Sequence, residues 1–291
     1  MAGGRRAVLI AGPTASGKSA LALTVAAEAG GVIVNADALQ VYDGLHLLTA
    51  RPGTDDLASA PHRLYGTVSP DQRFSTGDWV RAVARVIDED KPLVFVGGTG
   101  LYFEALTKGL AMVPSVPPEA VAWATAQVAG LSREERGRLI AERDPETARR
   151  LKAPDPQRVI RALAVQRATG RSLATFQDAP QSGLLAGWTL EKIVLAPSRD
   201  VLRERIARRF FRMLEEGAAE EAQVFLTRGL DPSLPAMKAI GLREIGEWLA
   251  GRSTHEEMME RAVTATRQYA KRQRTWFRNR MADWEWREPA G

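Results

Sequence analysis

Residues 12–19 have the residue types and order of a phosphate-binding loop. They lie between an apolar run at 8–11 and a helix-like stretch at 19–29, so that a strand, a loop and a helix follow one another. Glycines in such a loop let successive backbone N–H groups turn toward one anion, beside the positive end of the helix. The residues predicted to bind a pyrophosphate or polyphosphate are Gly12, Pro13, Thr14, Ala15, Ser16, Gly17, Lys18, whose charge adds to the site, and Ser19, whose hydroxyl is a candidate Mg²⁺ ligand.

Two further polar residues follow predicted strands. Asp37 comes soon after the apolar run 32–34, and Thr99 comes after the run 93–96 and two glycines. Because the carboxyl ends of parallel strands meet at one edge of a sheet, both residues are expected beside the phosphate loop. A carboxylate there can assist a metal or accept a proton from an incoming nucleophile, although such an acid can also cap a helix or a loop.

Nucleotide-hydrolysing P-loop proteins usually end another strand in an acid that helps to hold the metal. The strand predicted at 93–96 instead runs into Gly97-Gly98-Thr99-Gly100, with no carboxylate. This pattern argues against a kinase and leaves open whether a phosphoryl group moves at all.

Two stretches carry rows of cations at helical spacing. Residues 261–280 contain seven Arg or Lys and no acid. A row of like charges on one helix face repels itself, so the pattern favours a polyanionic partner over a solvated face. The later row consists of Arg267, Lys271, Arg274 and Arg278, and the earlier row of Arg205, Arg208, Arg209 and Arg212, from which one or two arginines can reach the phosphate.

Strands alternate with helical patterns at both ends of the chain but not in its middle. From 119 to about 177 the pattern is helical and highly charged, with no convincing strand, and irregular stretches flank it, so the insertion is placed at 114–185. The predicted fold is therefore α/β: a P-loop, kinase-like parallel sheet core at 1–113 and 186–291, with an inserted all-helical domain.

One helix of the insertion groups polar residues near its start. A proline after Asp155 marks the first turn, which brings Gln157, Arg158 and Arg161 together. Such residues can contact base edges and phosphates, or the arginines can pair with Asp155 or Glu146.

The composition excludes several classes of site. The 291 residues include no cysteine, so disulfides, zinc–thiolate sites and cysteine nucleophiles are excluded. The first apolar run is too short for a signal-peptide core or a membrane span, which predicts a cytoplasmic protein. The formal net charge is +5, and the two cationic rows make its distribution uneven.

Several ordered segments resemble one enzyme family. The segments GPTASGKS, NADALQVY, APHRL, GGTGLYF, DPQRVIRAL, RERIARRFFRML, KAIGLRE and TRQYAKRQRTWF are similar to those of the bacterial tRNA dimethylallyltransferases, or isopentenyl-tRNA transferases. The resemblance covers nearly the whole chain. It implies a monomer that transfers a dimethylallyl group from dimethylallyl pyrophosphate to N6 of the adenosine 3′ of the anticodon in tRNA, releases pyrophosphate and uses Mg²⁺ near Ser19.

The same resemblance implies roles for individual residues. Asp37 would be the general base for the adenine amine, Thr99 would lie in the reaction channel, and Lys18 and Arg209 would bind pyrophosphate. The implied tRNA contacts are Asp37, Ala38, Leu39, Gln40, Thr99, Gln157, Arg158, Val159, Ile160, Arg161, Lys238, Ala239, Ile240, Gly241, Leu242, Arg243, Lys271, Arg274 and Arg278. Ala38 and Leu242 depart from the family pattern, which commonly has Ser and Tyr there.

Three alternatives differ in acceptor or in class. An adenylate isopentenyltransferase acts on free AMP and needs no long cationic surface. A P-loop small-molecule kinase usually has the acid that is missing here. A non-catalytic RNA-binding P-loop protein does not need Asp37.

Overall fold

The computed structural model describes residues 5–87, 91–179 and 181–289 and divides into two compact units. Unit 1 comprises Met1–Thr107 and Leu184–Gly291, and unit 2 comprises Lys108–Gly183. The predicted insertion, 114–185, differs from unit 2 by a few residues at each end. No helix within the described ranges combines the length and the apolar character needed to cross a lipid bilayer.

Unit 1 is built on a six-stranded sheet in the order β3-β2-β4-β1-β5-β6, in which every neighbouring pair is parallel. The register pairs Ala11 with Gly97 and Asn35 with Val96, so the loops after β1, β2 and β4 leave the sheet at the same level. The strands are β1 (Arg6–Ala11), β2 (Val32–Asn35), β3 (His62–Arg63), β4 (Leu93–Gly97), β5 (Thr189–Leu195) and β6 (Glu285–Arg287).

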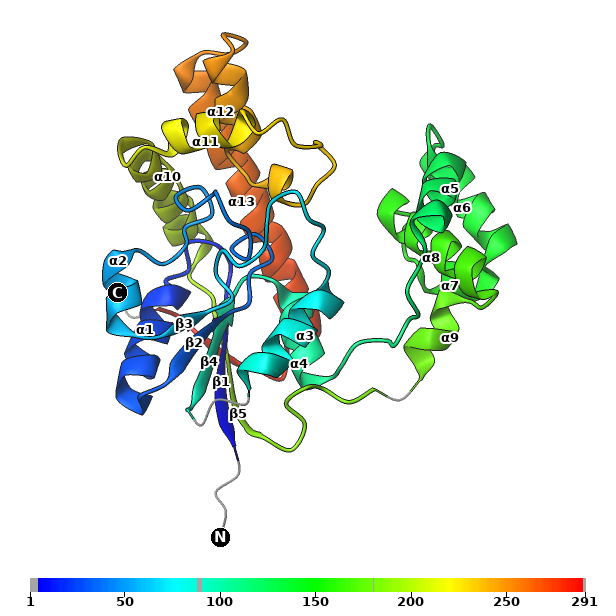
Figure 1. Ribbon diagram of the computed structural model, residues 1–291, viewed down its shortest axis with the longest axis horizontal. Coiled ribbons are helices and arrows are strands. Elements are labelled where there is room, and N and C mark those ends of the chain that lie inside the picture. Colours follow the sequence, from blue (N-terminus) through cyan, green and yellow to red (C-terminus); the bar gives the residue numbers. More distant parts are fainter. Residues whose placement is uncertain (1–4, 88–90, 180, 290–291) are drawn as a thin grey trace. The chain divides into compact units, whose positions relative to one another are not determined.

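Helices cover both faces of this sheet (Figure 1). Side chains alternate along a strand, so Ile10 and Ile33 pack with α1, whereas Leu9 and Val34 join the larger core on the other face. The covering helices are α1 (Lys18–Ala29) on the first face and α3 (Thr76–Val86), α4 (Gly100–Thr107) and α13 (His255–Arg280) on the second. The P-loop α/β core predicted from the sequence is therefore confirmed.

The longest helix, α13, links several parts of unit 1. It packs against α10, α12 and α4, and Figure 1 shows it in red, running from α12 toward α4. The remaining elements of unit 1 are α2 (Thr54–Ser59), α10 (Arg199–Glu215), α11 (Ala218–Leu226), the 3₁₀ turn η1 (Ala236–Lys238) and α12 (Leu242–Leu249).

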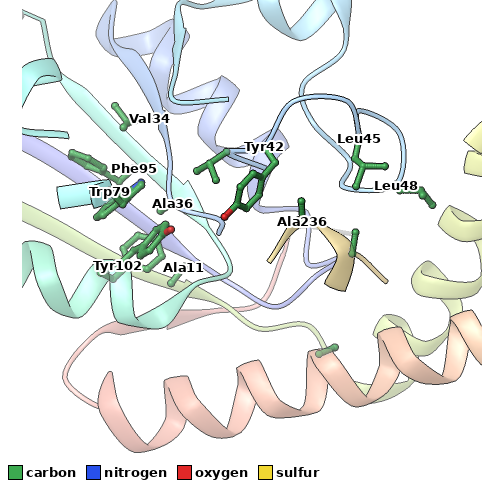
Figure 2. Close-up of a cluster of buried hydrophobic side chains, with 14 of the residues drawn as sticks. Ala11, Val34, Ala36, Tyr42, Leu45, Leu48, Trp79, Phe95, Tyr102 and Ala236 are labelled. Carbon is green, nitrogen blue, oxygen red and sulfur yellow. The ribbon is translucent and has the colours of Figure 1, made fainter. Parts of the chain in front are cut away.

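A buried aromatic pair supports the end of β2 (Figure 2). The rings of Trp79 and Tyr102 stack with centroids 4.1 Å apart and planes 12° apart. The indole Nε1 of Trp79 donates a hydrogen bond to the backbone oxygen of Asn35 at 2.9 Å. Because stacking and this hydrogen bond act together, the chain leaves β2 in a fixed direction, two residues before Asp37.

Unit 2 consists of helices, with no strand among its described residues. Its own apolar core includes Ala124, Val159, Leu163 and Phe176. The helices are α5 (Pro118–Val128), α6 (Arg133–Arg143), α7 (Pro145–Arg150), α8 (Pro156–Thr169) and α9 (Leu173–Asp178).

Candidate active site

The phosphate loop leads directly into α1. Ala15 and Gly17 have left-handed backbone conformations, with φ of 62° and 90°, which turn the chain into the helix. Within the described ranges, the backbone N–H groups of Ala15, Gly17, Lys18 and Ser19 donate to no protein acceptor. Free N–H groups at a helix N-terminus attract anions, so this loop has the donors that a phosphate group needs.

Ser16 lies inside the loop and is fully buried. Its hydroxyl has no hydrogen-bond partner among the residues that the structure describes. A Cβ atom at position 12 would lie 2.6 Å from this hydroxyl, so only glycine fits at Gly12. A buried hydroxyl without a partner costs free energy, which supports the loop as a place where a ligand completes the hydrogen bonding.

Four arginines of α10 line the same cavity as residues 15–19. This phosphate cavity is open, has a volume of about 370 Å³ and is lined by Arg205, Arg208, Arg209 and Arg212. Arg205 donates to the backbone oxygen of Ser16 at 3.5 Å, and Arg209 donates to the Thr14 hydroxyl. The earlier cationic row of the sequence is thus the wall of this cavity.

Two cations of the phosphate cavity have lowered pKa values. Burial lowers the pKa of Lys18 to about 8; the Asp37 carboxylate opposes this shift and Arg209 adds to it. Burial also lowers the pKa of Arg209, again against the effect of Asp37. Because both cations have lost part of their hydration, a bound anion interacts with them more strongly than it would at the protein surface.

Asp37 is positioned by a buried asparagine. The side chain of Asn35 accepts from the Asp37 backbone N–H at 2.8 Å and donates to the backbone oxygens of Asp37 and Leu64, each at 3.0 Å. The Asp37 carboxylate accepts from the Leu39 N–H through Oδ1 at 2.9 Å, whereas Oδ2 has no hydrogen-bond partner within the described ranges. One carboxylate oxygen is therefore available for chemistry.

Thr99 joins the loop after β4 to the loop that carries Asp37. Its hydroxyl accepts from the Ala38 N–H at 2.9 Å, and its own N–H donates to the backbone oxygen of Ala36 at 3.1 Å. The loops after β2 and β4 are thus joined by hydrogen bonds. The phosphate loop and the loop after β2 line one pocket, through Thr14 and Asp37.

A small pocket opens beside Asp37 and shares Arg209 with the phosphate cavity. Its volume is about 70 Å³. Polar groups of Thr14, Asp37, Thr49, Arg209, Thr266 and Tyr269 line it together with the apolar side chains of Leu39, Leu48, Ile206, Phe210, Met213 and Ile240. This pocket, which we call the apolar pocket after its six apolar lining side chains, therefore places a carboxylate and a cation beside apolar groups.

The other residues of unit 1 that were predicted to contact RNA differ in exposure. The Gln40 amide nitrogen donates to the backbone oxygens of Thr49 at 2.8 Å and Ala50 at 2.7 Å, so it holds a neighbouring loop. Of the segment 238–243, the side chains of Lys238 and Arg243 are exposed, Ile240 lines the apolar pocket, and Ala239, Gly241 and Leu242 are buried. Burial leaves Ala239 and Leu242 only their backbone for any contact with RNA.

The later cationic row forms part of a groove between α10 and α13. The groove has a volume of about 340 Å³ and contains no acid among its lining residues, all of which are described. We call it the cationic groove; its cations are Arg199, Arg203, Arg267, Lys271, Arg274 and Arg278, and its apolar floor consists of Leu202, Ile206 and Ala270. Arg274 also donates to the backbone oxygen of Pro197 at 2.7 Å.

In unit 2, the polar residues at the start of α8 are exposed. Gln157, Arg158 and Arg161 face solvent, Ile160 is half-buried, and Val159 is fully buried in the core of the unit. Asp155 caps the helix by accepting from the Arg158 N–H at 3.2 Å. Neither arginine forms an ion pair with Asp155 or Glu146 within the described part of the chain, so the alternative pairing is not seen.

Two residues that position the loops of this site were given no role from the sequence. Asn35 holds the backbone of Asp37, and Gln273 of α13 bonds to the phosphate loop. Asn35 adjoins Asp37, and the polar residue after an apolar strand is a usable signal. Gln273 lies 259 residues beyond Thr14, and nothing local in the sequence marks their contact.

A metal ion at this site would need ligand atoms from the bound substrate as well as from the protein. The described residues contain no group of three His, Cys, Asp or Glu side chains that could hold a metal ion by themselves. The Ser19 hydroxyl is exposed at the start of α1. Mg²⁺ commonly binds through few protein ligands together with substrate phosphates, and this donor set fits that arrangement.

The fold and the site together define a P-loop α/β protein with a cavity suited to a phosphate group on one side of Arg209 and a carboxylate in a second pocket on the other. A sequence profile of the IPP transferase family matches residues 40–280. The chain belongs to this family, and it is a prenyltransferase enzyme.

Curated relatives are similar over almost their whole length. A tRNA dimethylallyltransferase of Chelativorans sp. (strain BNC1) is 51% identical, with 96% of this chain and 97% of that protein covered. One of Cereibacter sphaeroides is 52% identical, with 96% and 94% covered. These matches agree with the resemblance seen in the sequence motifs.

Solved structures agree in fold. The tRNA isopentenylpyrophosphate transferase of Bacillus halodurans superposes with a TM-score of 0.69 at 31% identity, covering 98% of this chain and 90% of that one. A eukaryotic dimethylallyltransferase acting on tRNA gives a TM-score of 0.79 at 24% identity, covering 94% and 70%, which shows the shared fold.

Proposed function

We propose that this enzyme transfers a dimethylallyl group from dimethylallyl pyrophosphate to N6 of the adenosine 3′ of the anticodon in tRNA. The observation that carries the proposal is that the phosphate cavity and the apolar pocket share Arg209, while Asp37 lies in the wall of the pocket. The donor pyrophosphate occupies the phosphate cavity, and the adenine enters the pocket. The IPP transferase family membership and the named relatives support this assignment.

The reaction breaks the bond between the allylic carbon and the pyrophosphate oxygen and forms a bond between that carbon and N6. Pyrophosphate leaves with the bonding electrons. Lys18, Arg209 and the free N–H groups of the loop stabilise the negative charge that develops on it. Asp37 Oδ2 accepts the proton that N6 loses.

Mg²⁺ held by the Ser19 hydroxyl and the pyrophosphate oxygens would add positive charge beside the leaving group when bound. Thr99 fixes the Ala38 backbone and thereby the direction in which the Asp37 loop faces the adenine. The missing acid after β4 agrees with this chemistry, because that acid is typical of enzymes that transfer a phosphoryl group and here the bond that breaks is between carbon and oxygen.

Recognition of tRNA is assigned to exposed cations of both units. An adenine stacked in an RNA loop must leave its stack to enter a pocket, which costs a few kcal/mol. Phosphate contacts from the cationic groove, Lys238 and Arg243 in unit 1, and Arg158 and Arg161 in unit 2, offset this cost. We place this activity in the cytoplasm, because its proposed partner is tRNA.

Transfer assays with separate acceptors test the proposal. The chain is incubated with radiolabelled dimethylallyl pyrophosphate and either unmodified tRNA or AMP, and with labelled ATP and small acceptors. Label is expected on tRNA alone. Label on AMP but not tRNA would identify an adenylate isopentenyltransferase, phosphate transfer from ATP would identify a kinase, and tRNA binding without transfer would identify a binding protein.

A further inference from the structure

Gln273 connects two loops of the active site from a distant part of the chain. It belongs to α13, is 6% exposed and makes two hydrogen bonds through one amide group. Its Oε1 accepts from the Thr14 backbone N–H at 2.9 Å, and its Nε2 donates to the backbone oxygen of Gly98 at 2.9 Å. A single side chain thus bridges the phosphate loop and the loop after β4.

Further contacts connect this bridge to the loop that carries the Asp37 carboxylate. Gly98 precedes Thr99, whose hydroxyl holds the Ala38 N–H beside Asp37. A Cβ atom at position 98 would lie 2.1 Å from Gln273 Nε2 and 3.2 Å from Asp37 Oδ2, so glycine is required where the three residues meet. The amide of Gln273 therefore lies between the phosphate loop and the loop after β4, at the glycine that faces Asp37.

The position requires an amide. One bond needs an acceptor and the other a donor, and a glutamine side chain offers both at one end. Glutamate has the same shape but offers no donor when ionised, and methionine has a similar length but offers neither. Losing the amide would leave a buried N–H or C=O group without a partner.

We propose that Gln273 is a positioning residue that fixes the phosphate loop relative to Asp37 without touching either reacting group. The inference rests on the proposed function for its kinetic consequence. The Thr14 hydroxyl also accepts a hydrogen bond from the Arg209 guanidinium. The same bridge therefore positions this cation between the two cavities. A displacement of about 1 Å in such an arrangement is enough to reduce turnover about a hundredfold.

The variants Gln273→Met and Gln273→Glu test this inference, with Gln223→Met on the exposed face of α11 as the matched control. Turnover is expressed per pyrophosphate-binding site counted by calorimetry, so that unfolded molecules do not contribute. We expect kcat to fall about a hundredfold in Gln273→Met and at least about tenfold in Gln273→Glu. KM for dimethylallyl pyrophosphate and for tRNA should stay within about threefold of the wild-type values.

Amide hydrogen exchange gives a second readout that does not depend on turnover. The Thr14 amide should exchange faster in Gln273→Met and at the wild-type rate in Gln223→Met. An unchanged kcat in Gln273→Met, or an unchanged Thr14 exchange rate, would overturn the inference. If the wild-type chain transfers nothing to tRNA, the proposed function fails, and the exchange comparison still decides whether Gln273 fixes the loop.

Discussion

Asp37 has one carboxylate oxygen engaged and one without a partner within the described residues. Oδ1 accepts from the Leu39 N–H, and an asparagine at this position would keep that contact through its own carbonyl oxygen. Asp37→Asn should therefore fold normally and lose the proton acceptor, together with the negative charge that raises the pKa of Lys18 and Arg209. We expect the single-turnover rate of transfer to fall by about 10²- to 10⁴-fold, the usual contribution of general-base catalysis.

Filter binding of tRNA to the Asp37→Asn variant provides the control for that prediction. The affinity should stay within about twofold of wild type, because the change removes no cation. Weak tRNA binding combined with normal turnover would assign Asp37 to recognition instead of catalysis.

The charge of Lys18 should make the reaction with dimethylallyl pyrophosphate depend on pH near 8. Its pKa is lowered to about 8, so above that pH the free enzyme loses the charge that attracts pyrophosphate. The value of kcat/KM for dimethylallyl pyrophosphate should be highest below about pH 8 and fall as pH rises through it. In Lys18→Arg the guanidinium stays protonated, so this fall should disappear even if the maximum is lower. A decline of the same shape in both proteins would assign the titration to another group.

At the scale of elements, α11 holds the loop that forms one wall of the apolar pocket. Glu221 accepts from the backbone N–H groups of His46 at 2.5 Å, Leu47 at 2.8 Å and Leu48 at 2.9 Å, and Leu48 lines the pocket. One carboxylate therefore satisfies three donors that no strand or helix pairs. The strength of these three hydrogen bonds depends on the negative charge of the carboxylate.

Glu221→Gln removes that charge with little change in shape. We expect the free energy of unfolding to decrease by about 1–2 kcal/mol, because hydrogen bonds to a charged acceptor are stronger than those to a neutral one. Urea denaturation measures it. Glu220→Gln removes a neighbouring exposed charge from the same first turn and should change stability by less than about 0.5 kcal/mol. Equal effects of the two changes would show that the helix charge, not the loop contact, is responsible.

The sequence predicts those features of the site that are local in the chain. The phosphate loop and Asp37 each follow an apolar strand, and parallel strand ends meet at one edge of a sheet, so their neighbourhood was predictable. The two-residue β3 and the three-residue β6 are too short for a pattern. Val159 and Leu242 lie inside segments that resemble RNA-contacting motifs, yet a helix turns such side chains into the core.

The groove and the Gln273 bridge depend on packing between elements that are far apart in sequence. The spacing of each cationic row predicts one helix face. It does not predict that Arg199 and Arg203 of α10 stand across from the row on α13, because that arrangement follows from how the two helices pack. Tertiary contacts of this kind carry no local signature.

At the scale of the whole molecule, the uneven charge of the chain predicts how tRNA binding responds to salt. Each phosphate contact that is lost reduces the slope of log affinity against log salt concentration by about one unit. Arg267, Lys271 and Arg278 are exposed cations of the cationic groove, whereas Arg274 bonds to the backbone of Pro197 and is left in place. Replacing the three by alanine should weaken tRNA binding and flatten the slope by about two to three units.

The control for this prediction removes the same number of charges elsewhere on unit 1. Replacing Arg85, Lys91 and Arg252 by alanine takes three exposed cations outside the groove from a chain whose formal net charge is +5. If tRNA binding follows the groove, this variant keeps the wild-type slope within about half a unit, since only bound phosphates release counterions. If both variants flatten the slope equally, net charge alone attracts the RNA and the groove has no special role. Titrations of labelled tRNA at several salt concentrations, with thermal melting to check folding, separate the two outcomes.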